Sequence, residues 1–199
     1  YGTFSPIEKY TVKGILFYQG CSNVGNPGNM YSDLLAALAK QWRAAFGRGD
    51  IPFYIVEIAP YENGNPAGDW AAKLREQQLR ASRIIPNSGF VCTNDCVYPW
   101  ELKQIHPAKK RPVGERLAYQ ALNKTYGMKS VWCESPTFKS LTVSNDTCYV
   151  KLDNTYGGMN RLEGIEGFEV AGADKVFHKA TATYSWEKGV VVTCPEVKA

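Results

Sequence analysis

Short apolar runs alternate with amphipathic stretches along the first two thirds of the chain. Each apolar run is typical of a buried strand, and in each amphipathic stretch apolar residues recur at helical spacing. The expected strands are residues 14–18, 53–58 and 88–93, and the expected helices are residues 31–42, 70–83 and 113–126. This rhythm predicts an α/β fold in which helices cover a parallel sheet. The loops that follow the three strands are expected to share one edge of the sheet, where such folds bind ligands.

Beyond Gly127 the pattern changes to the period-two alternation that is typical of antiparallel strands. Strands are expected at residues 138–143, 147–152, 167–171, 179–186 and 189–193. The sequence therefore predicts two domains. Residues 1–129 hold the α/β part, and residues 130–199 form a β-rich domain or part of one.

Composition and charge exclude several classes of protein. With 44% hydrophobic and 21% charged residues, the 199-residue chain has the composition of a globular protein. The net charge is only +4, and basic residues are scattered among acidic ones apart from residues 109–111, so no nucleic-acid partner is expected. No apolar run reaches the roughly 18 residues that a membrane helix needs, so no membrane association is expected.

The cysteines and histidines give no sign of a metal site. The six cysteines form no CxxC pair, and only two histidines accompany them. Free thiols are expected, and a disulfide between Cys133 and Cys148 in an oxidising compartment is left open as an alternative.

Three segments carry a resemblance to a known family. They are KGILFYQGCSN at residues 13–23, the run from residue 31 through QWRAAFG and DIPFYIVEIAPY to WAAKLREQQ at residues 70–78, and IHPAKKRPVGERLAYQAL at residues 105–122. Together and in this order they resemble the sialate O-acetylesterase family of SGNH hydrolases. The resemblance implies a three-layer α/β/α, flavodoxin-like fold that is incomplete at its N-terminus. It also implies a serine carboxylic-ester hydrolase that removes O-acetyl groups from sialic acid or a related sugar without a cofactor.

The resemblance assigns His106 as the general base, a role that suits a side chain titrating near neutral pH. Many SGNH hydrolases place an aspartate three residues before this histidine, but here that position holds Lys103. Asp95, at the end of the third expected strand, is the preferred acid to orient the imidazole. Glu101 is an alternative, and the absence of any protein acid is another.

The oxyanion hole is expected in the loop after the first strand. The family's pattern places the oxyanion donor at Asn23, supported by Gln19 and Gly20. Cys21 stands where the family more often has glutamate, and we interpret it as a buried small side chain rather than a nucleophile. Ser22 is interpreted as scaffold. Arg75, in the LREQQ segment, is expected either to face the substrate or buttress the rim, or else to form a structural salt bridge.

The family's nucleophilic serine lies in a GQSNM-like block upstream of the YQG segment, and the 199 residues contain no such block. The serine is therefore expected on a missing N-terminal segment, which would be a physical partner of this chain. Family resemblance favours a secreted or periplasmic location. Two other functions stay open: an inactive carbohydrate-binding or structural fragment, and an acetylxylan-type polysaccharide deacetylase.

Overall fold

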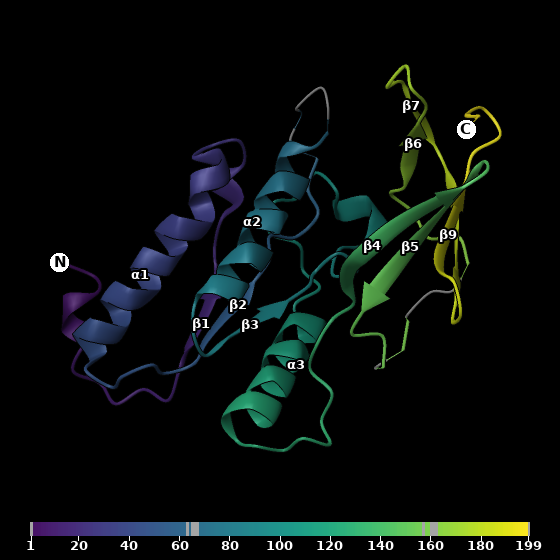
Figure 1. The fold of residues 1–199 in the computed structure, drawn as a ribbon. Coiled ribbons are helices and arrows are strands. Elements are labelled where there is room, and N and C mark those ends of the chain that lie inside the picture. The colour runs from purple at the N-terminus through teal and green to yellow at the C-terminus, as the bar shows by residue number, and fades with distance from the viewer. Residues whose placement is uncertain (1, 63, 65–67, 157, 160–162, 199) are drawn as a thin grey trace. The chain divides into compact units, whose positions relative to one another are not determined.

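A computed structural model describes residues 2–62, 64, 68–156, 158–159 and 163–198. The chain divides into two compact units, Tyr1–Cys133 and Glu134–Ala199. The helices and strands of the first unit are β1 (Ile15–Tyr18), α1 (Tyr31–Phe46), β2 (Phe53–Val56), α2 (Trp70–Ile84), β3 (Ser88–Val91) and α3 (Arg111–Gln120) (Figure 1). These elements form a mixed α/β unit with a parallel sheet, as the sequence predicts.

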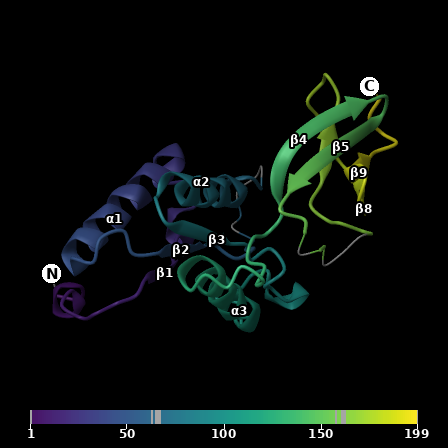
Figure 2. The same ribbon diagram turned by 60° about the horizontal axis from the view of Figure 1, so that its bottom comes forward.

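The three strands of this sheet run parallel in the order β1-β2-β3. Their registers align Tyr18 with Val56 and Val56 with Val91, so the strands end side by side. Helices α1 and α2 lie on one face of the sheet and α3 lies on the other (Figure 2). The segments that leave the three strands therefore begin at one common edge.

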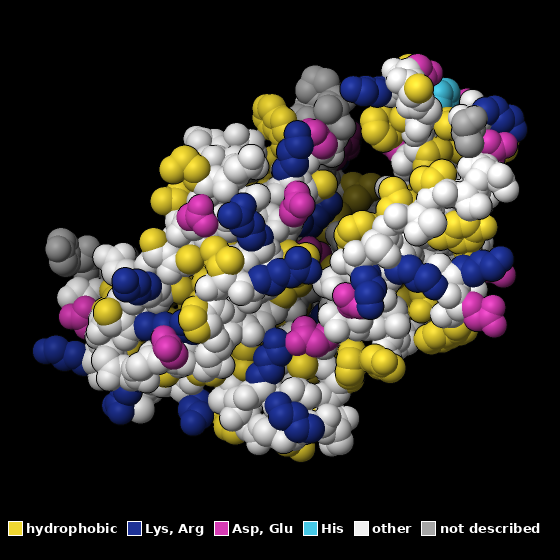
Figure 3. All heavy atoms as spheres, viewed as in Figure 1, with side chains coloured by type: hydrophobic (Ala, Val, Ile, Leu, Met, Phe, Trp, Pro, Cys, Tyr) yellow, Lys and Arg dark blue, Asp and Glu magenta, His cyan; other side chains and the backbone are white. Residues whose placement is uncertain are grey.

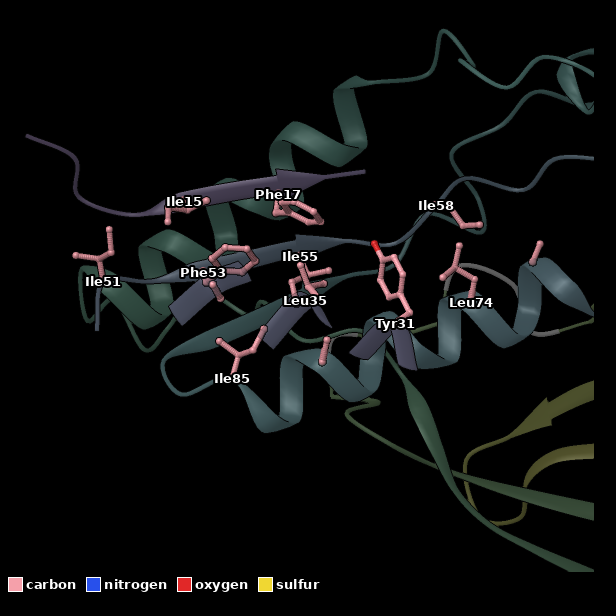
Figure 4. Packing of buried hydrophobic residues seen from close by; sticks show 13 residues of the cluster. Ile15, Phe17, Tyr31, Leu35, Ile51, Phe53, Ile55, Ile58, Leu74 and Ile85 are labelled. Atoms are coloured by element: carbon pink, nitrogen blue, oxygen red, sulfur yellow. The ribbon is translucent and has the colours of Figure 1, made fainter. Parts of the chain in front are cut away.

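Strand β2 is buried on both faces because alternate side chains enter different layers. Phe53 and Ile55 pack in the cluster formed with α1 and α2 (Figure 4). Val56 packs against Val113 of α3. Strand β1 differs, since its alternate residues Leu16 and Tyr18 are exposed. Among the described residues no strand pairs with the outer edge of β1, which makes it an edge strand.

The helix ends follow local chemistry. Helix α1 ends where Gly47 adopts φ = 61°, and the Gly47 N–H donates to the carbonyls of Arg43 and Ala44. Glycine adopts this left-handed conformation without steric cost, so it stops the helix. The third helix was expected to run to residue 126. Its α-helical part ends at Gln120, and one π-helical turn, Ala121–Thr125, completes it.

The second unit is built from antiparallel strands. Strands β4 (Thr137–Ser144), β5 (Thr147–Asp153), β8 (Thr181–Ser185) and β9 (Gly189–Thr193) form a sheet in the order β4-β5-β9-β8, and β6 (Glu169–Ala171) pairs with β7 (Phe177–Lys179). Its buried core contains Ala182, Val190 and Val192. The prediction of one strand over residues 179–186 is wrong, because the two parts of that segment pair with different strands.

Two further features concern the charged side chains on the surface and the apolar character of the helices. On the face shown in Figure 3, basic and acidic side chains are interspersed rather than separated. Within the described part of the chain, none of the helices has the length and apolar character needed to cross a membrane.

Candidate active site

The end of β1 is held by a buried amide bridge. Gln78 of α2 is fully buried. Its Nε2 donates to the carbonyl oxygen of Gln19 at 2.9 Å, and its Oε1 accepts the N–H of Ile58 at 2.9 Å. The hydroxyl of Tyr31 also donates to the Gln19 carbonyl, at 3.3 Å. One side chain therefore joins the segments that leave β1 and β2, and both of its polar ends are satisfied.

Gly20 follows this anchor and cannot be replaced without strain. Its φ is 143°, a conformation that side chains rarely adopt. A Cβ atom at this position would lie 2.9 Å from Nε2 of Gln78 and 3.1 Å from the hydroxyl of Tyr31. The glycine therefore lets the backbone pass close to the buried bridge and turn into the loop.

Asn23 ends the short turn Cys21–Asn23. Its N–H donates to the carbonyl of Gly20 at 2.7 Å, and its Oδ1 accepts a hydrogen bond from Nε2 of Gln19 at 2.9 Å. The oxygen end of the amide is thus committed, and Nδ2 is the end that carries hydrogens to donate. A fixed neutral donor of this kind can stabilise a developing oxyanion.

The thiol of Cys21 fits the interpretation as part of the scaffold. The side chain is half-buried and packs against the main hydrophobic cluster. Burial raises the pKa of Cys21, and the nearby charge of Lys110 lowers it by a smaller amount. A thiol with a raised pKa stays protonated at neutral pH and is a poor nucleophile.

A buried carboxyl lies at the end of β2, which the sequence analysis did not select. Glu57 accepts the N–H of Thr93 at 2.6 Å, and the Thr93 hydroxyl contacts the carbonyl oxygens of Glu57 and Ile58 at 3.3 and 3.2 Å. Burial raises the pKa of Glu57, against the opposing effects of the Cys92 thiol, Thr93 and the charges of Arg75 and Arg116. The sequence contains a feature that could have identified it, since Glu57 is the one charged residue in the apolar run FYIVEIA.

Asp95 is paired with a cation from α3. Nη1 and Nη2 of Arg116 donate to its two carboxylate oxygens, each at 2.7 Å. These bonds lower the pKa of Asp95, so the group is ionised at neutral pH. Lys109 Nζ donates to the backbone carbonyl of Asp95 at 2.7 Å. The loop after β3 is thereby attached both to α3 and to the segment that follows His106.

His106 is exposed, and the loop around it is held by Glu101. The two carboxylate oxygens of Glu101 accept the N–H groups of Ala108, at 3.0 Å, and Tyr98, at 3.3 Å. The His106 N–H itself bonds to Oε1 of Gln104 at 3.2 Å. Among the described residues, the imidazole has no hydrogen-bond partner. The structure therefore brings neither of the two candidate acids into a hydrogen bond with it.

The segment that follows His106 contacts the end of β1, where the loop that contains Asn23 begins. Nζ of Lys110, four residues after His106, lies 5.1 Å from the centre of the Tyr18 ring at the end of β1. Lys110 thus links the segment that follows His106 to the end of β1.

Among the described residues, which include all six cysteines, no disulfide is formed, so Cys133 and Cys148 are not joined. Among the residues that the structure describes, no three His, Cys, Asp or Glu side chains are grouped so as to hold a metal ion. The chemistry that this edge offers consists of an imidazole, carboxylates, guanidinium groups and amide donors.

Comparisons with known proteins show which family the chain resembles. A sequence model described as carbohydrate esterase, sialic acid-specific acetylesterase, matches residues 4–123. The chain is 28% identical over 144 residues to the sialate O-acetylesterase of Homo sapiens, covering 66% of this chain and 28% of that protein. It is 26% identical over 179 residues to the sialate O-acetylesterase of Mus musculus, covering 83% of this chain and 33% of that protein.

A solved structure adds to these sequence relatives. The crystal structure of a novel carbohydrate acetylesterase from Xanthomonas citri superimposes with a TM-score of 0.79 at 32% identity, covering 98% of this chain and 44% of that one. The chain thus spans less than half the length of each of these relatives. With the matched family model extending over more than half of its residues, the chain belongs to the sialic acid-specific acetylesterase family of carbohydrate esterases.

Proposed function

We propose that this chain is part of an enzyme that removes O-acetyl groups from sialic acid or a related acetylated sugar by serine-type acyl transfer. The observation that carries the proposal is the approach of Lys110 to Tyr18, 5.1 Å from Nζ to ring centre. This contact joins the segment that follows His106 to the end of β1, where the loop that ends at Asn23 begins. A base and an oxyanion donor at one edge are two of the three parts that acyl transfer needs.

The proposed reaction has two halves. A serine hydroxyl attacks the acetyl carbonyl while His106 takes its proton, and Asn23 Nδ2 donates to the oxygen that becomes negative. The tetrahedral intermediate collapses, His106 returns the proton to the departing sugar oxygen, and the acetyl group stays on the serine. Water, deprotonated by His106, then attacks this ester. As the bond between the acetyl carbon and the serine oxygen breaks, His106 returns the proton to that oxygen and acetate leaves.

The serine in this proposal comes from a segment outside these 199 residues. Two observations support the edge of β1 as its docking place. Leu16 and Tyr18 are exposed on one face of this edge strand. On the other side, a groove of about 390 Å³ is lined by Gln19 and Asn23 together with apolar residues such as Phe17. A further strand paired to β1 would bury this apolar surface and end beside Asn23.

Asp95 is the acid that we propose orients the imidazole. Its carboxylate accepts two hydrogen bonds from Arg116 and one from the thiol of Cys96, at 3.6 Å, so it is ionised and fixed in the loop after β3, where it can attract the imidazolium that forms during the reaction. Glu101 is the alternative, and its two oxygens are engaged by backbone N–H groups on either side of the histidine loop.

The test of the proposal is acetate release by the full-length protein from O-acetylated N-acetylneuraminic acid and, in parallel, from acetylated xylan. His106→Ala is expected to lower kcat about 10³-fold or more, because the attacking hydroxyl and the leaving oxygen both lose their proton carrier. The matched control is His178→Ala, which removes the other histidine, located on β7 and bonded to Glu196 at 2.9 Å. Near-normal turnover by the His106 variant would reject the mechanism. Release from xylan alone would reject the sialic acid substrate.

A further inference from the structure

A stacked pair of aromatic side chains stands on the loop that carries His106. The rings of Tyr98 and Trp100 are nearly parallel, at 4°, with centroids 4.8 Å apart. Trp100 is 78% exposed. Tryptophan contributes a large apolar surface and is usually mostly buried, so a ring left open to solvent on a functional loop points to a ligand.

The loop fixes this pair next to the proposed base. The carboxylate of Glu101 accepts the N–H of Tyr98 and also that of Ala108, two residues beyond His106. Lys109 Nζ lies 5.5 Å from the centre of the Tyr98 ring and donates to the carbonyl of Asp95 at 2.7 Å. Hydrogen bonds and stacking thus order the backbone and one ring before a ligand arrives, which lowers the entropy lost on binding.

We propose that the open face of Trp100, supported by Tyr98, is the surface on which the sugar ring of the substrate stacks. This inference rests on the proposed function, which supplies an acetylated sugar as the ligand. One face of a pyranose ring presents C–H groups that are apolar and slightly positive, and an aromatic face is apolar and carries the negative side of its quadrupole. The ring can bind there while its acetyl ester extends toward His106.

The pair would recognise the ring rather than the ester. It therefore contributes to the binding of the substrate and makes no contact with the reacting atoms. Removing it is expected to raise KM and to leave kcat unchanged. An acetyl ester without a ring would gain nothing from it. This difference separates a stacking surface from a residue that only shapes the loop.

The experiment compares wild type, Trp100→Ala and Trp100→Phe in the full-length protein. The substrates are O-acetylated N-acetylneuraminic acid and ethyl acetate, which has no ring. Trp100→Ala is expected to raise KM for the sugar ester about tenfold, the equivalent of one aromatic contact, with kcat for that ester and kcat/KM for ethyl acetate unchanged. Trp100→Phe is expected to recover most of the loss. Trp186→Ala, which removes a tryptophan that is 67% exposed in the second unit, is the matched control.

An unchanged KM for the sugar ester in Trp100→Ala, with both esters turned over by wild type, overturns the stacking surface and leaves the proposed function intact. A parallel loss of ethyl acetate turnover also overturns it, since it shows that the ring only supports the loop. If wild type hydrolyses neither ester, the proposed function fails. The stacking surface is then tested by measuring sugar binding instead of turnover. NMR titrations of wild type and Trp100→Ala with N-acetylneuraminic acid and with xylobiose then support the surface if the variant loses binding, and refute it if binding is equal or absent.

Discussion

The guanidinium of Arg116 and the carboxylate of Asp95 meet fork to fork, with both N···O distances at 2.7 Å. Nη1 of Arg116 also donates to the carbonyl of Cys92 at 2.7 Å. Helix α3 is therefore fastened to the loop that leaves β3. Because the Asp95 side chain is 44% exposed, solvent screens part of this attraction, and the pair contributes less than a buried one would.

Replacing Arg116 by Met should lower stability by about 1 to 2 kcal/mol at neutral pH, because a paired carboxylate and a bonded carbonyl lose their donor. The loss should depend on pH. The pKa of Asp95 in the folded protein lies below its ordinary value of 3.8, so the pair stabilises the fold fully above that value. The difference from wild type should shrink as the pH falls below 3.8 and through the lower folded pKa. Urea unfolding at pH 7 and at pH 3 measures both differences.

The control for this variant is Arg111→Met, at the first residue of the same helix. Arg111 pairs with Glu115 at 2.7 Å, but its side chain is 88% exposed. Little change in stability is expected at either pH. Equal losses in the two variants would show that the fork between Arg116 and Asp95 adds nothing specific.

The two candidate acids can be separated by amide substitutions. Asp95→Asn should lower kcat about 10²-fold or more if its charge orients His106. Glu101→Gln should lower kcat less than about tenfold, since its one amide oxygen can still accept the N–H of Ala108 and only the longer bond to the N–H of Tyr98 is lost. Steady-state kinetics of the two full-length variants, measured well below their melting temperatures, provides the comparison. The reverse order would move the orienting role to Glu101.

The donor role of Asn23 can be tested without disturbing its neighbour. Asn23→Asp keeps an oxygen for the hydrogen bond from Nε2 of Gln19 but replaces the donor by a negative charge. The expected result is a fall in kcat of about 10² to 10³-fold with a small change in KM, as for loss of an oxyanion donor. Asn29→Asp, in the turn just before α1, adds the same charge nearby and is expected to retain most of the activity. Equal activities of the two variants would count against the assignment.

Gly20→Ala should be costly for two reasons. Its φ of 143° suits only glycine, and the added methyl would lie 2.9 Å from Gln78 Nε2. We expect a loss of about 2 to 3 kcal/mol in the free energy of unfolding. Gly49→Ala is the matched control, because Gly49 also has a positive φ, 67°, but nothing lies near its missing Cβ. It should cost about 1 kcal/mol. A smaller loss of stability at Gly20 than at Gly49 would show that the side chains around Gly20 can move to admit the methyl group at little cost.

Much of the α/β unit could be predicted because its signals are local. Helical periodicity locates α1 and α2, and Gly47 marks the end of α1 through its own backbone preference. In the second unit, the period-two pattern continues through Ala180 although the chain changes partners there. The N–H of Ala180 still bonds to the carbonyl of Phe168, beside β6, whereas Thr181 already pairs with β9. Periodicity describes which face a residue occupies and carries no information about which strand lies beside it.

The polar part of the site was harder to predict for a related reason. Gln78 lay in a segment that the sequence analysis quoted, but its partners are backbone groups of Gln19 and Ile58, which no spacing rule connects. The fork between Arg116 and Asp95 joins positions 21 residues apart. Trp100 gave no periodic signal, because its importance comes from exposure and from the stacked Tyr98 ring.

The bridge made by Gln78 also bears on how this site can evolve. Its atoms belong to Gln19, Ile58 and Gln78, with the hydroxyl of Tyr31 added. Residues 24–30, which connect the oxyanion loop to α1, contribute no atom to it. Natural selection can therefore change the length and chemistry of that connection while the backbone of Gln19 and Gly20 keeps its position.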